Sequence, residues 1–484
     1  MGAPIRVLSV ASEVFPFVKT GGLADVAGAL PVALARENVA VRTLMPGYRA
    51  VMAEMARAKV VLEYAALFGG PARVRAGNAR GLDMLVLDAP HLFDRDGGPY
   101  ADRRGHDFPD NAFRFAALCR AAADVAWGDV AEFVPDVVHC HDWQAGLAPA
   151  YLHYANRPRP RTVMTVHNMA FQGQFDVTCD NLGLPWHAWS IEGVEYYGSV
   201  GYLKAGLQLA DRITTVSPTY AEEIKTPDGG MGLDGLLRHR ALALRGIRNG
   251  IDDRVWNPAD DPHLPAPFDA RHRVARGASR DALRTHFAIA APGPLFGVVS
   301  RLTWQKGMDL VLDCIPRIVD GGGHLAVLGS GDAALERAFV EAARVHRGRV
   351  AVHVGYDEGL AHLMQAGSDA MLVPSRFEPC GLTQMCALRY GALPVVSRVG
   401  GLADTVVDAG APASRVGTGI SFLPVTADGL ASAIGRTLTL WNDQPAWKRV
   451  QSRAMAADVS WKAPAKEYAN LYREVVEGPP ARRT

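Results

Sequence analysis

Residues 19–25 read Lys-Thr-Gly-Gly-Leu-Ala-Asp and follow the first apolar run of the chain, residues 7–10. Two adjacent glycines let the backbone turn tightly and approach a ligand closely, because neither carries a Cβ atom. Residues 23–35 predict a helix, which places the Gly-Gly amides at its N-terminus. A helix N-terminus attracts anions, and Lys19 adds a full positive charge beside it. We therefore expect a strand, a glycine turn and a helix that together hold an anionic ligand.

The pentapeptide Gly-Gly-Leu-Ala-Asp occurs a second time at residues 400–404, again after an apolar run, residues 393–396. Two similar halves that each present a glycine turn to a shared cleft explain both copies. Chance also explains them, because Gly, Leu and Ala are common in this chain. The second copy lacks the preceding Lys-Thr, so we expect it mainly to shape a strand-to-helix turn.

Length and charge limit the possible functions. A chain of 484 residues is comfortable for two domains. Its 51 Lys and Arg balance 50 Asp and Glu, so no overall field favours nucleic acid or an anionic membrane. Its six cysteines form no Cys-x-x-Cys pair and are expected to be reduced thiols. No signal peptide and no apolar run of about 20 residues is evident, which predicts a cytoplasmic protein.

Short apolar runs alternate with longer helical patterns throughout the chain, which is typical of buried parallel strands in right-handed βαβ units. The first series lies at residues 7–10, 84–87, 137–141, 163–166 and 213–216. The second lies at residues 295–299, 325–328, 350–354, 370–373 and 393–396. The pattern predicts an α/β protein with two Rossmann-like, doubly wound domains.

The domain boundary is expected near residues 248–252, because residues 257–268 contain four prolines and several aspartates, as an exposed connector does. The first domain is therefore placed at residues 1–248 and the second at residues 249–460. A helix is expected over residues 463–477. The polar, glycine-rich stretch 94–110 has no helical period, and long loops of this kind are often functional or mobile.

Polar residues gather just after the predicted strands, where doubly wound sheets bind their ligands. They are Glu13 and residues 19–22; Asp142; His167 and Asn168; Arg301 and Lys306; residues 329–332; and residues 374–383. Arg301 and Lys306 are the most informative pair, because a diphosphate requires fixed positive charge. Gly307 then opens an apolar helix whose N-terminus would face the same anion. The alternative is a surface pair in a turn, which the position directly after a strand makes less attractive.

Glu378 lies in a predicted strand-end loop before a helix that begins at Leu382 or Thr383. The amides of residues 381–383 could bind a phosphate or sugar hydroxyls, whereas Glu378 suits a sugar hydroxyl or a developing cation. The alternative for Glu378 is a carboxylate that stabilises a helix N-terminus by about 0.3–1 kcal/mol.

Two further patterns carry less weight. His139, Cys140, His141 and Asp142 are ligand-type residues, but alternate side chains of a strand face opposite ways and cannot all reach one metal. No metal site is therefore predicted, and strand packing accounts better for His139 and Cys140. Residues 329–331 resemble a dinucleotide fingerprint, but no acidic residue ends the next strand to hold a ribose, so nicotinamide binding is not expected.

The full set of motifs strongly resembles bacterial glycogen synthases and plant starch synthases, from residue 7 to about residue 472. The matching segments are Lys-Thr-Gly-Gly-Leu-Ala-Asp-Val (19–26), His-Asp-Trp (141–143), Thr-Val-His-Asn (165–168), Val-Ser-Pro-Thr-Tyr (216–220), Asn-Gly-Ile-Asp (249–252), Ser-Arg-Leu-Thr-Trp-Gln-Lys-Gly (300–307) and Pro-Ser-Arg-Phe-Glu-Pro-Cys-Gly-Leu-Thr-Gln (374–384). One such motif is modest evidence, whereas the set in this order is highly specific.

The resemblance implies a GT-B type glycosyltransferase with an interdomain cleft. Such enzymes transfer glucose from ADP-glucose to the non-reducing end of glycogen or another α-1,4-glucan, retain the anomeric configuration and require no metal or other cofactor. The family's last helix commonly crosses back to the first domain, which implies that residues 461–484 do so here.

The resemblance also implies roles for individual residues. On the donor side, Arg301 and Lys306 would hold the diphosphate, Glu378 would contact the glucose, and Cys380, Gly381, Leu382 and Thr383 would form the phosphate-binding turn. On the other side, Asp142, His167, Asn168 and Asn249 would lie at the glucose, Lys19, Gly21 and Gly22 would complete the site, and Tyr100 would stack on the adenine. Many related enzymes carry a second glutamate eight residues after the first; this chain has Cys386 there, which leaves Gln384 as a candidate ribose partner.

Several alternatives stay open at this point. A UDP-glucose-dependent or other retaining transferase of the same fold, such as a sucrose or trehalose-phosphate synthase, fits the second half, although the Lys-Thr-Gly-Gly-Leu segment argues against it. A non-catalytic glucan-binding protein is disfavoured because Lys19, His167, Arg301, Lys306 and Glu378 are all present. The sequence leaves open the strictness for the adenine base, the preferred glucan length and the oligomeric state.

Overall fold

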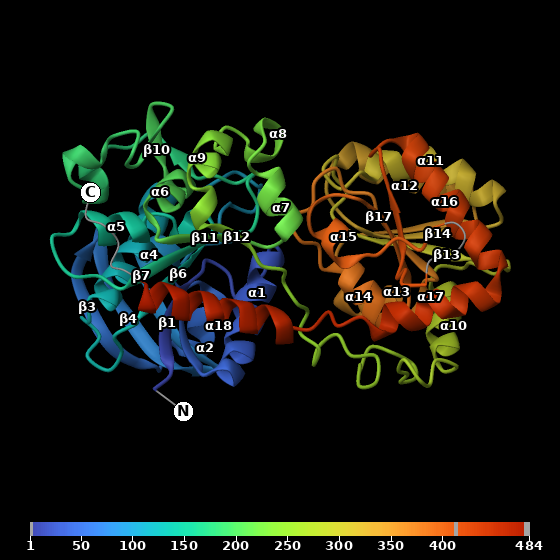
Figure 1. Ribbon diagram of the computed structural model, residues 1–484, viewed down its shortest axis with the longest axis horizontal. Helices are drawn as coiled ribbons and strands as arrows, with labels where there is room; N and C mark the ends of the chain where they lie inside the picture. Colours follow the sequence, from blue (N-terminus) through green and yellow to red (C-terminus); the bar gives the residue numbers. More distant parts are fainter. Residues whose placement is uncertain (1–2, 411–414, 479–484) are drawn as a thin grey trace. The chain divides into compact units, whose positions relative to one another are not determined.

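The computed structural model describes residues 3–410 and 415–478 and divides the chain into two compact α/β units (Figure 1). Unit 1 comprises Met1–Asn249 together with Trp461–Thr484, and unit 2 comprises Gly250–Ser460. Residues 479–484, the end of the predicted C-terminal segment, lie outside the described residues. No helix within the described ranges is long and apolar enough to cross a membrane.

Unit 1 is built on a mixed sheet with the strand order β12-β11-β7-β6-β1-β2-β5-β4-β3. Its strands are β1 (Ile5–Val10), β2 (Val39–Pro46), β3 (Lys59–Leu67), β4 (Gly70–Ala79), β5 (Leu82–Asp88), β6 (Val137–His141), β7 (Arg161–Val166), β11 (Arg212–Thr215) and β12 (Leu244–Gly246). A small antiparallel sheet contains β8 (Gln174–Phe175), β9 (Glu195–Tyr196) and β10 (Ser199–Gly201). The helices are α1 (Gly22–Leu34), α2 (Arg49–Met55), α3 (Pro90–Phe93), α4 (Asn111–Ala126), α5 (Ala148–Tyr154), α6 (Tyr202–Leu209), α7 (Pro218–Glu223), α8 (Pro227–Gly230), α9 (Asp234–His239) and α18 (Lys462–Glu477).

The expectation of parallel strands is wrong at one end of this sheet, where β3, β4 and β5 pair antiparallel. Two-residue turns join them, Phe68-Gly69 and Arg80-Gly81, and all four residues have positive φ. Turns of that kind match the twist of a hairpin, and a connection of two residues is too short for a parallel crossover. The sequence analysis missed β2, β3 and β4, although each turn carries a glycine at its second position.

Helix α4 fixes the polar stretch that precedes it. Arg114 is 1% exposed and donates hydrogen bonds to the carbonyl oxygens of Leu92 at 2.8 Å and Pro99 at 2.9 Å. The side chain of Asn111 donates to the carbonyl of Tyr100 at 2.9 Å. Because these bonds satisfy backbone groups that would otherwise lack partners, residues 94–110 are held in place and Tyr100 is brought towards the sheet.

Helix α18 belongs to unit 1, where it packs on α1 and on the start of the parallel strands (Figure 1). Its fully buried Tyr468 and Tyr472 share an apolar cluster with residues of β1, β6 and β7. The hydroxyl of Tyr472 lies 2.8 Å from Nδ1 of His139, whose Nε2 lies 2.6 Å from Oγ1 of Thr165. The helix expected over residues 463–477 is thus present, and it anchors the end of the chain to the sheet of unit 1.

Unit 2 is a parallel sheet with the order β15-β14-β13-β16-β17-β18. Its strands are β13 (Leu295–Val299), β14 (His324–Gly329), β15 (Val350–Val354), β16 (Ala370–Val373), β17 (Leu393–Ser397) and β18 (Ile420–Phe422). Its helices are α10 (Arg276–His286), α11 (Met308–Asp320), α12 (Ala333–Val345), α13 (Glu358–Gly367), α14 (Thr383–Tyr390), α15 (Gly400–Thr405), α16 (Ala427–Asn442) and α17 (Gln444–Ala456). All five apolar runs predicted in this half are strands; only the three-residue β18 was missed.

Side chains of these strands bury both faces of the unit 2 sheet. Leu295 and Leu328 pack with α10 and α13 on one face, whereas Phe296 and Val327 pack with α11 and α16 on the other. Near-continuous apolar strands are required when helices cover both faces. The doubly wound, Rossmann-like class predicted from the alternating pattern is therefore confirmed for unit 2.

We expect Tyr472→Phe to lower the free energy of unfolding of the chain by about 1–3 kcal/mol, because it leaves the buried Nδ1 of His139 without its partner. Thermal unfolding of the full chain measures the change. Tyr197→Phe, at a side chain that is 77% exposed, is the matched control. Equal unfolding temperatures for the two variants would contradict this role of α18.

Candidate functional site

In unit 1 the loop after β1 is held by the buried carboxylate of Glu13, which is 3% exposed. It accepts hydrogen bonds from the backbone N–H of Thr20, from the Thr20 hydroxyl at 2.6 Å and from the Tyr100 hydroxyl. A carboxylate with three donors fixes the loop more strongly than neutral hydrogen bonds can. The sequence placed Glu13 after a strand but did not reveal this positioning role, because Tyr100 lies 87 residues away in the chain.

The predicted anion-binding residues follow on the same loop. Gly21 is the N-cap residue of α1 and Gly22 is its first residue, so the Gly-Gly amides lie at the helix N-terminus as expected. A Cβ atom at either glycine would meet no atom within 4 Å, which leaves open space above the amides. Nζ of Lys19 lies 2.9 Å from Oδ1 of Asp25, in a pair that solvent reaches. The loop therefore presents two amides and one cation to an unfilled space.

Tyr100 is bound into unit 1. Its hydroxyl lies 2.8 Å from the Ser12 hydroxyl and donates to Glu13, and its ring centroid lies 5.8 Å from that of Phe115 and 6.3 Å from that of Trp143. Burial raises its pKa well above the usual value, so the hydroxyl keeps its proton. These contacts do not favour the predicted stacking on adenine. They make Tyr100 a support for Glu13.

Asp142 follows β6 with a φ of 55°, a left-handed conformation that a non-glycine residue adopts only under constraint. Its backbone N–H donates to the Thr165 carbonyl at 2.9 Å, and its Oδ1 accepts from the backbone N–H of His167 at 2.6 Å. Burial raises the pKa of its carboxyl to about 7, the backbone N–H groups of His167 and Asn168 oppose this rise, and the charge of Glu13 adds to it. Asp142 therefore titrates near neutral pH beside the loop that Glu13 holds.

His167 and His141 form a buried pair at the ends of β7 and β6. Nε2 of His167 lies 3.0 Å from Nδ1 of His141, and Nε2 of His141 lies 3.3 Å from the Ser9 hydroxyl. Burial lowers the pKa of His141 to about 3 and that of His167 well below the usual value. Both imidazoles are neutral at pH 7, so one ring donates and the other accepts, which fixes the orientation of His167. The sequence predicted a site role for His167, whereas His141 was quoted in a motif without such a role.

The remaining predicted residues of unit 1 are Asn168 and Asn249, which follow β7 and β12. Oδ1 of Asn168 accepts from the backbone N–H of Ala170 at 3.0 Å. Asn249 is 6% exposed, and within the described part of the chain its Oδ1 is buried without a hydrogen-bond partner. An unsatisfied buried oxygen costs about 1–3 kcal/mol, which a ligand that donates a hydrogen bond would recover.

In unit 2, Lys306 and Glu378 form a close pair at the carboxyl ends of β13 and β16. Nζ of Lys306 lies 2.5 Å from Oε2 of Glu378, and the Ser375 hydroxyl donates to the same oxygen at 2.9 Å. Glu378 is 6% exposed. The sequence predicted both residues but not their pairing. Both contacts use Oε2, so Oε1 of Glu378 has no described protein partner. Ser375 was part of the quoted motif and received no role.

Arg301 stands apart from this pair. It is exposed, it follows β13, and its guanidinium makes no ion pair with any residue the structure describes. The structure brings Lys306 and Glu378 into contact and leaves Arg301 available for a ligand. A free guanidinium can grip a phosphate with two parallel N–H groups.

Gly307 shapes the loop that follows β13 in unit 2. Gly307 has a φ of +69°, and a Cβ atom there would lie 2.1 Å from the Pro374 carbonyl oxygen. The 301–307 and 374–378 loops are tied together by Arg376, which donates to both carboxylate oxygens of Asp309 at 2.7 and 2.6 Å and to the Trp304 carbonyl at 2.7 Å. Gly307 is therefore required both for its conformation and for this close approach.

The second Gly-Gly-Leu-Ala-Asp copy forms the start of α15 and packs on the Glu378 loop. The N–H of Gly401 donates to the carbonyl of Glu378 at 3.0 Å, and a Cβ atom there would lie 2.2 Å from the carbonyl oxygen of Cys380. Gly381, with a φ of +70°, then turns the chain into α14, so Leu382 and Thr383 lie at its N-terminus. The copy shapes this turn, as predicted.

The contacts of Gln384 support the turn before α14 and do not by themselves favour a ribose, although its Oε1 is buried without a hydrogen-bond partner among the described residues. Its side chain is fully buried, and its Nε2 donates to the carbonyls of Cys380 at 2.9 Å and Gly381 at 2.8 Å and to the Thr405 hydroxyl at 3.1 Å. These bonds lock the turn between Cys380 and Gly381. The sequence alone could not distinguish this role from ligand binding.

His139 and Cys140 pack within unit 1. Both side chains are buried in β6, and the rings of His139 and His141, on the same face of the strand, lie 4.1 Å apart. Among the residues that the structure describes, no group of three or more His, Cys, Asp or Glu side chains is arranged to hold a metal ion.

Comparison with known proteins gives consistent matches. The family profile described as "Starch synthase catalytic domain" matches residues 6–239, and the profile described as "Glycosyl transferases group 1" matches residues 293–439. A protein named glycogen synthase from Rhodopseudomonas palustris (strain BisB18) is 58% identical over 485 residues, which cover 99% of both chains. Glycogen synthase 2 of Bradyrhizobium diazoefficiens is 57% identical over 477 residues, 98% of this chain and 99% of the relative.

Solved structures show the same fold. The catalytic domain of starch synthase IV from Arabidopsis thaliana, bound to ADP and acarbose, superposes with a TM-score of 0.86 and 30% identity over 98% of this chain and 100% of that chain. A sucrose-phosphate synthase from Thermosynechococcus elongatus shares the fold with a TM-score of 0.59 and 17% identity over 98% of this chain and 99% of that chain. The predicted GT-B class, with two Rossmann-like units, is confirmed.

We expect the free energy of unfolding of Asp142→Asn to rise relative to that of the wild type as pH increases from about 4 to about 7. The folded state holds the Asp142 proton longer than the unfolded state, so stability falls over this window and stays lower above it. Asparagine keeps the acceptor for the His167 N–H and cannot titrate. Thermal unfolding at pH 5 and pH 8 measures the difference, with the exposed Asp180→Asn as control. A difference that does not grow with pH would contradict the burial of this carboxyl.

We expect Gly307→Ala to destabilise unit 2 more than Gly322→Ala does. Gly322 has a φ of +78° and open space around a Cβ atom, so alanine there meets only the conformational cost of about 1–2 kcal/mol. Alanine at position 307 meets the same conformational cost and, in addition, a clash with the Pro374 carbonyl oxygen. Unfolding temperatures of the two variants measure this difference, and an equal loss would show that the loops do not approach as closely as the structure has them.

Proposed function

We infer the reaction from the family to which the chain belongs, that of the bacterial glycogen synthases and plant starch synthases. The protein is a retaining hexosyltransferase that transfers glucose from ADP-glucose to the non-reducing end of an α-1,4-glucan and releases ADP. The observation that carries this conclusion for the chain's own residues is the Lys306–Glu378 pair, held beside the N-terminus of α14 with Arg301 free nearby in the chain.

We propose that unit 2 holds the donor. Arg301 and Lys306 supply fixed positive charge for the diphosphate, and the amides of Gly381, Leu382 and Thr383, at the start of α14, supply hydrogen-bond donors. Lys306 then serves two anions, the diphosphate and Glu378. The shared cation lies against the buried carboxyl group of Glu378, whose free Oε1 can accept a hydrogen bond from a glucose hydroxyl.

We propose that unit 1 supplies the groups around the transferred glucose. His167 and Asp142 follow adjacent parallel strands, and Asn168 and Asn249 follow strands of the same sheet, so their side chains share one edge of it. The unpartnered oxygen of Asn249 suits a sugar hydroxyl. Lys19 and the amides of Gly21 and Gly22 form an anion-binding end of α1, which suits the charge of the departing diphosphate.

The chemical step follows from the charges that develop. The bond between C1 of glucose and the phosphate oxygen breaks, so the sugar becomes positive and the phosphate negative. Arg301, Lys306 and Lys19 stabilise the phosphate, and the carboxylate of Glu378 stabilises the sugar. The O4 hydroxyl of the glucan attacks C1 from the face that the phosphate leaves, and its proton passes to the departing phosphate oxygen. The configuration at C1 is thereby retained without a covalent intermediate.

The finer assignments rest on this proposal. We propose ADP-glucose as the donor and glycogen or a similar α-glucan as the acceptor, with no added metal and no other cofactor, because the proposed donor site supplies protein cations and helix N-terminal amides for the diphosphate. A cytoplasmic location without nucleic-acid or membrane partners suits the near-zero net charge of +1 and the fully buried thiols.

We expect the full chain to transfer radiolabelled glucose from ADP-glucose to glycogen without added metal. Lys306→Ala and Glu378→Ala each lower kcat/KM by about 10²- to 10³-fold, because each removes a charge that acts on the reacting bond. Lys448→Ala, an exposed lysine of the same unit, is the matched control and retains full activity.

The outcomes separate the parts of the proposal. Undiminished transfer in Lys306→Ala or Glu378→Ala would show that the site is assigned wrongly. Transfer from UDP-glucose at the same kcat/KM as from ADP-glucose would show that the donor assignment is wrong. Absence of transfer from both nucleotide sugars would overturn the activity itself.

A further inference from the structure

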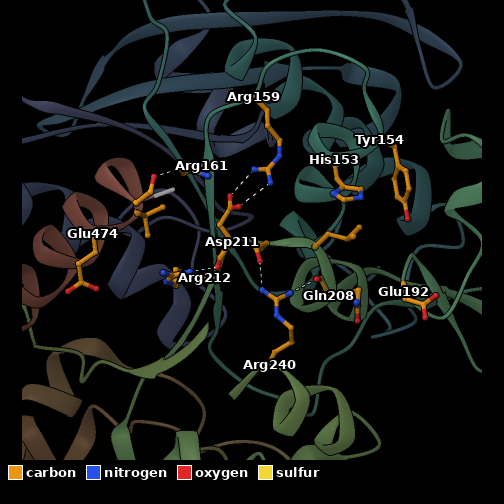
Figure 2. A pocket seen from close by; sticks show the side chains of 14 residues that line it. His153, Tyr154, Arg159, Arg161, Glu192, Gln208, Asp211, Arg212, Arg240 and Glu474 are labelled. Carbon is orange, nitrogen blue, oxygen red and sulfur yellow. Dashed lines mark hydrogen bonds and ion pairs between the residues drawn. The ribbon is translucent and has the colours of Figure 1, made fainter. Parts of the chain in front are cut away.

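A pocket of about 680 Å³ lies in unit 1 at the edge of the sheet opposite to the candidate site (Figure 2). It is lined by residues at the amino ends of β7 and β11 and by the last turn of α18. The predicted site residues His167 and Asn168 follow the other end of β7. At about 3.3 Å per residue, the length of this strand separates them from the pocket by about 20 Å. The pocket is therefore distinct from the candidate site, and its volume is in the range of small-molecule sites.

Four arginines line this pocket: Arg159, Arg161, Arg212 and Arg240. The acidic residues of the lining are Glu192, Asp211 and Glu474. Two of these carboxylates already have cationic partners. Both oxygens of Asp211 accept from Arg159, at 2.7 and 3.1 Å, and Glu474 lies 3.1 Å from Arg245, which is not part of the lining. Glu192 remains as the lining carboxylate without such a pair among the described residues.

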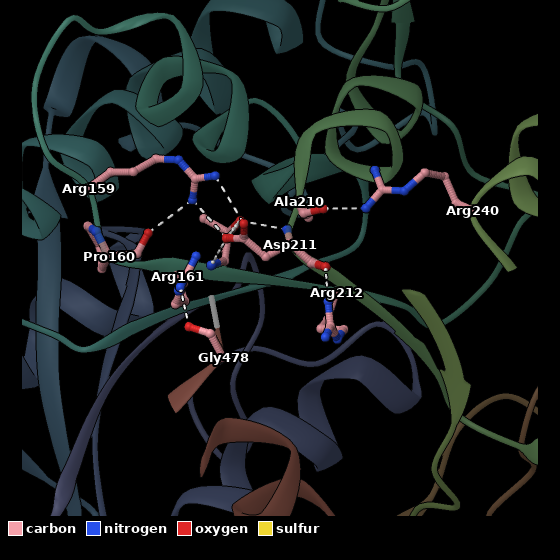
Figure 3. Close-up of polar contacts among 9 residues, drawn as sticks. Arg159, Pro160, Arg161, Ala210, Asp211, Arg212, Arg240 and Gly478 are labelled. Carbon is pink, nitrogen blue, oxygen red and sulfur yellow. Dashed lines mark hydrogen bonds and ion pairs between the residues drawn. The ribbon is translucent and has the colours of Figure 1, made fainter. Parts of the chain in front are cut away.

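Arg212 and Arg240 have no carboxylate partner in the part of the chain that the structure describes. Arg212 donates to the backbone carbonyl of Asp211 at 3.0 Å (Figure 3). Arg240 donates to the carbonyls of Leu207 at 3.1 Å, Gln208, and Ala210 at 2.6 Å, the last carbonyls of α6. A partly buried guanidinium that bonds directly only to neutral carbonyls has its charge compensated only in part; for Arg240 the nearby charge of Asp211 supplies that part. Burial accordingly lowers the pKa of Arg240.

We propose that this pocket binds a small molecule that carries phosphoryl groups, held by Arg212 and Arg240 with Arg161 beside them. Guanidinium groups match the geometry of phosphate oxygens, and an anion there would offset the charge that the two arginines leave uncompensated. An uncharged glucan segment fits less well. The ring of Tyr154 already packs edge-on against two histidines, with its centroid 4.8 Å from that of His153 and 5.5 Å from that of His187. Tyr154 therefore offers no free stacking platform within the lining.

Titration calorimetry of the full chain with inorganic pyrophosphate tests this proposal. The titration is made in a Lys19→Ala, Arg301→Ala, Lys306→Ala background, which removes the cations of the proposed catalytic site as competitors. Arg212→Gln is added to that background, because its loss removes only the bond to the backbone carbonyl of Asp211 and leaves the carboxylate of Asp211 bonded to Arg159 and Arg240 bonded to the end of α6. Arg57→Gln, at an exposed position of the same unit, is the matched control.

We expect pyrophosphate to bind one site in the background protein and in the Arg57→Gln control, and to bind about tenfold or more weakly after Arg212→Gln. Arg161→Gln, as a second variant, weakens binding in the same direction. No binding in the background protein, or equal affinity in the Arg212→Gln and Arg57→Gln proteins, would overturn the proposal. Because no step of this experiment measures glucose transfer, its outcome is independent of the proposed function.

Discussion

The turn at the carboxyl end of each parallel strand is the constraint on which both units depend. Parallel strands end at one edge of their sheet, and each must then be followed by a loop that exposes backbone amides to a ligand or to a side chain. Lys19, Asp142 and His167 occupy such turns in unit 1, as Arg301 and Glu378 do in unit 2. In unit 2 the backbone conformations that glycine adopts easily occur at these turns, at Gly307 and Gly381, which explains why glycines mark the motifs there.

Buried carboxylates hold these turns in position. Glu13 binds Thr20 and Tyr100, and Glu378 binds Lys306 and Ser375, so in each unit a residue that follows a strand is fixed by a charged hydrogen bond. A buried carboxylate is costly unless its partners are present, and removal of one partner costs more than the pair contributes. In unit 2 the proposed function uses the same arrangement, because Lys306, the cation that pairs with Glu378, is also the group that we propose for the diphosphate.

The sequence predicted the parallel strands of unit 2 and the residues at their ends, because near-continuous apolar runs and glycine turns are local signals. It missed β3 and β4, whose half-exposed strands and two-residue hairpins give weaker signals than buried strands do. It did not reveal that Glu13 anchors a loop or that Gln384 supports a turn, since both roles depend on contacts with residues whose positions only the folded chain fixes. Strand-end residues are thus predictable from pattern, whereas the division between ligand contacts and internal supports is not.

We propose that Lys306 has a dual role, shared between Glu378 and the donor diphosphate. Calorimetric binding of ADP to the wild type, Lys306→Ala, Glu378→Gln and the double variant tests this role without any transfer of glucose. We expect Lys306→Ala to weaken ADP binding about tenfold or more. We expect Glu378→Gln to bind ADP at least as tightly as the wild type, because Lys306 is released from its ion pair, and we expect this gain to disappear in the double variant. Equal weakening by both single variants, or a gain from Glu378→Gln that persists without Lys306, would contradict it.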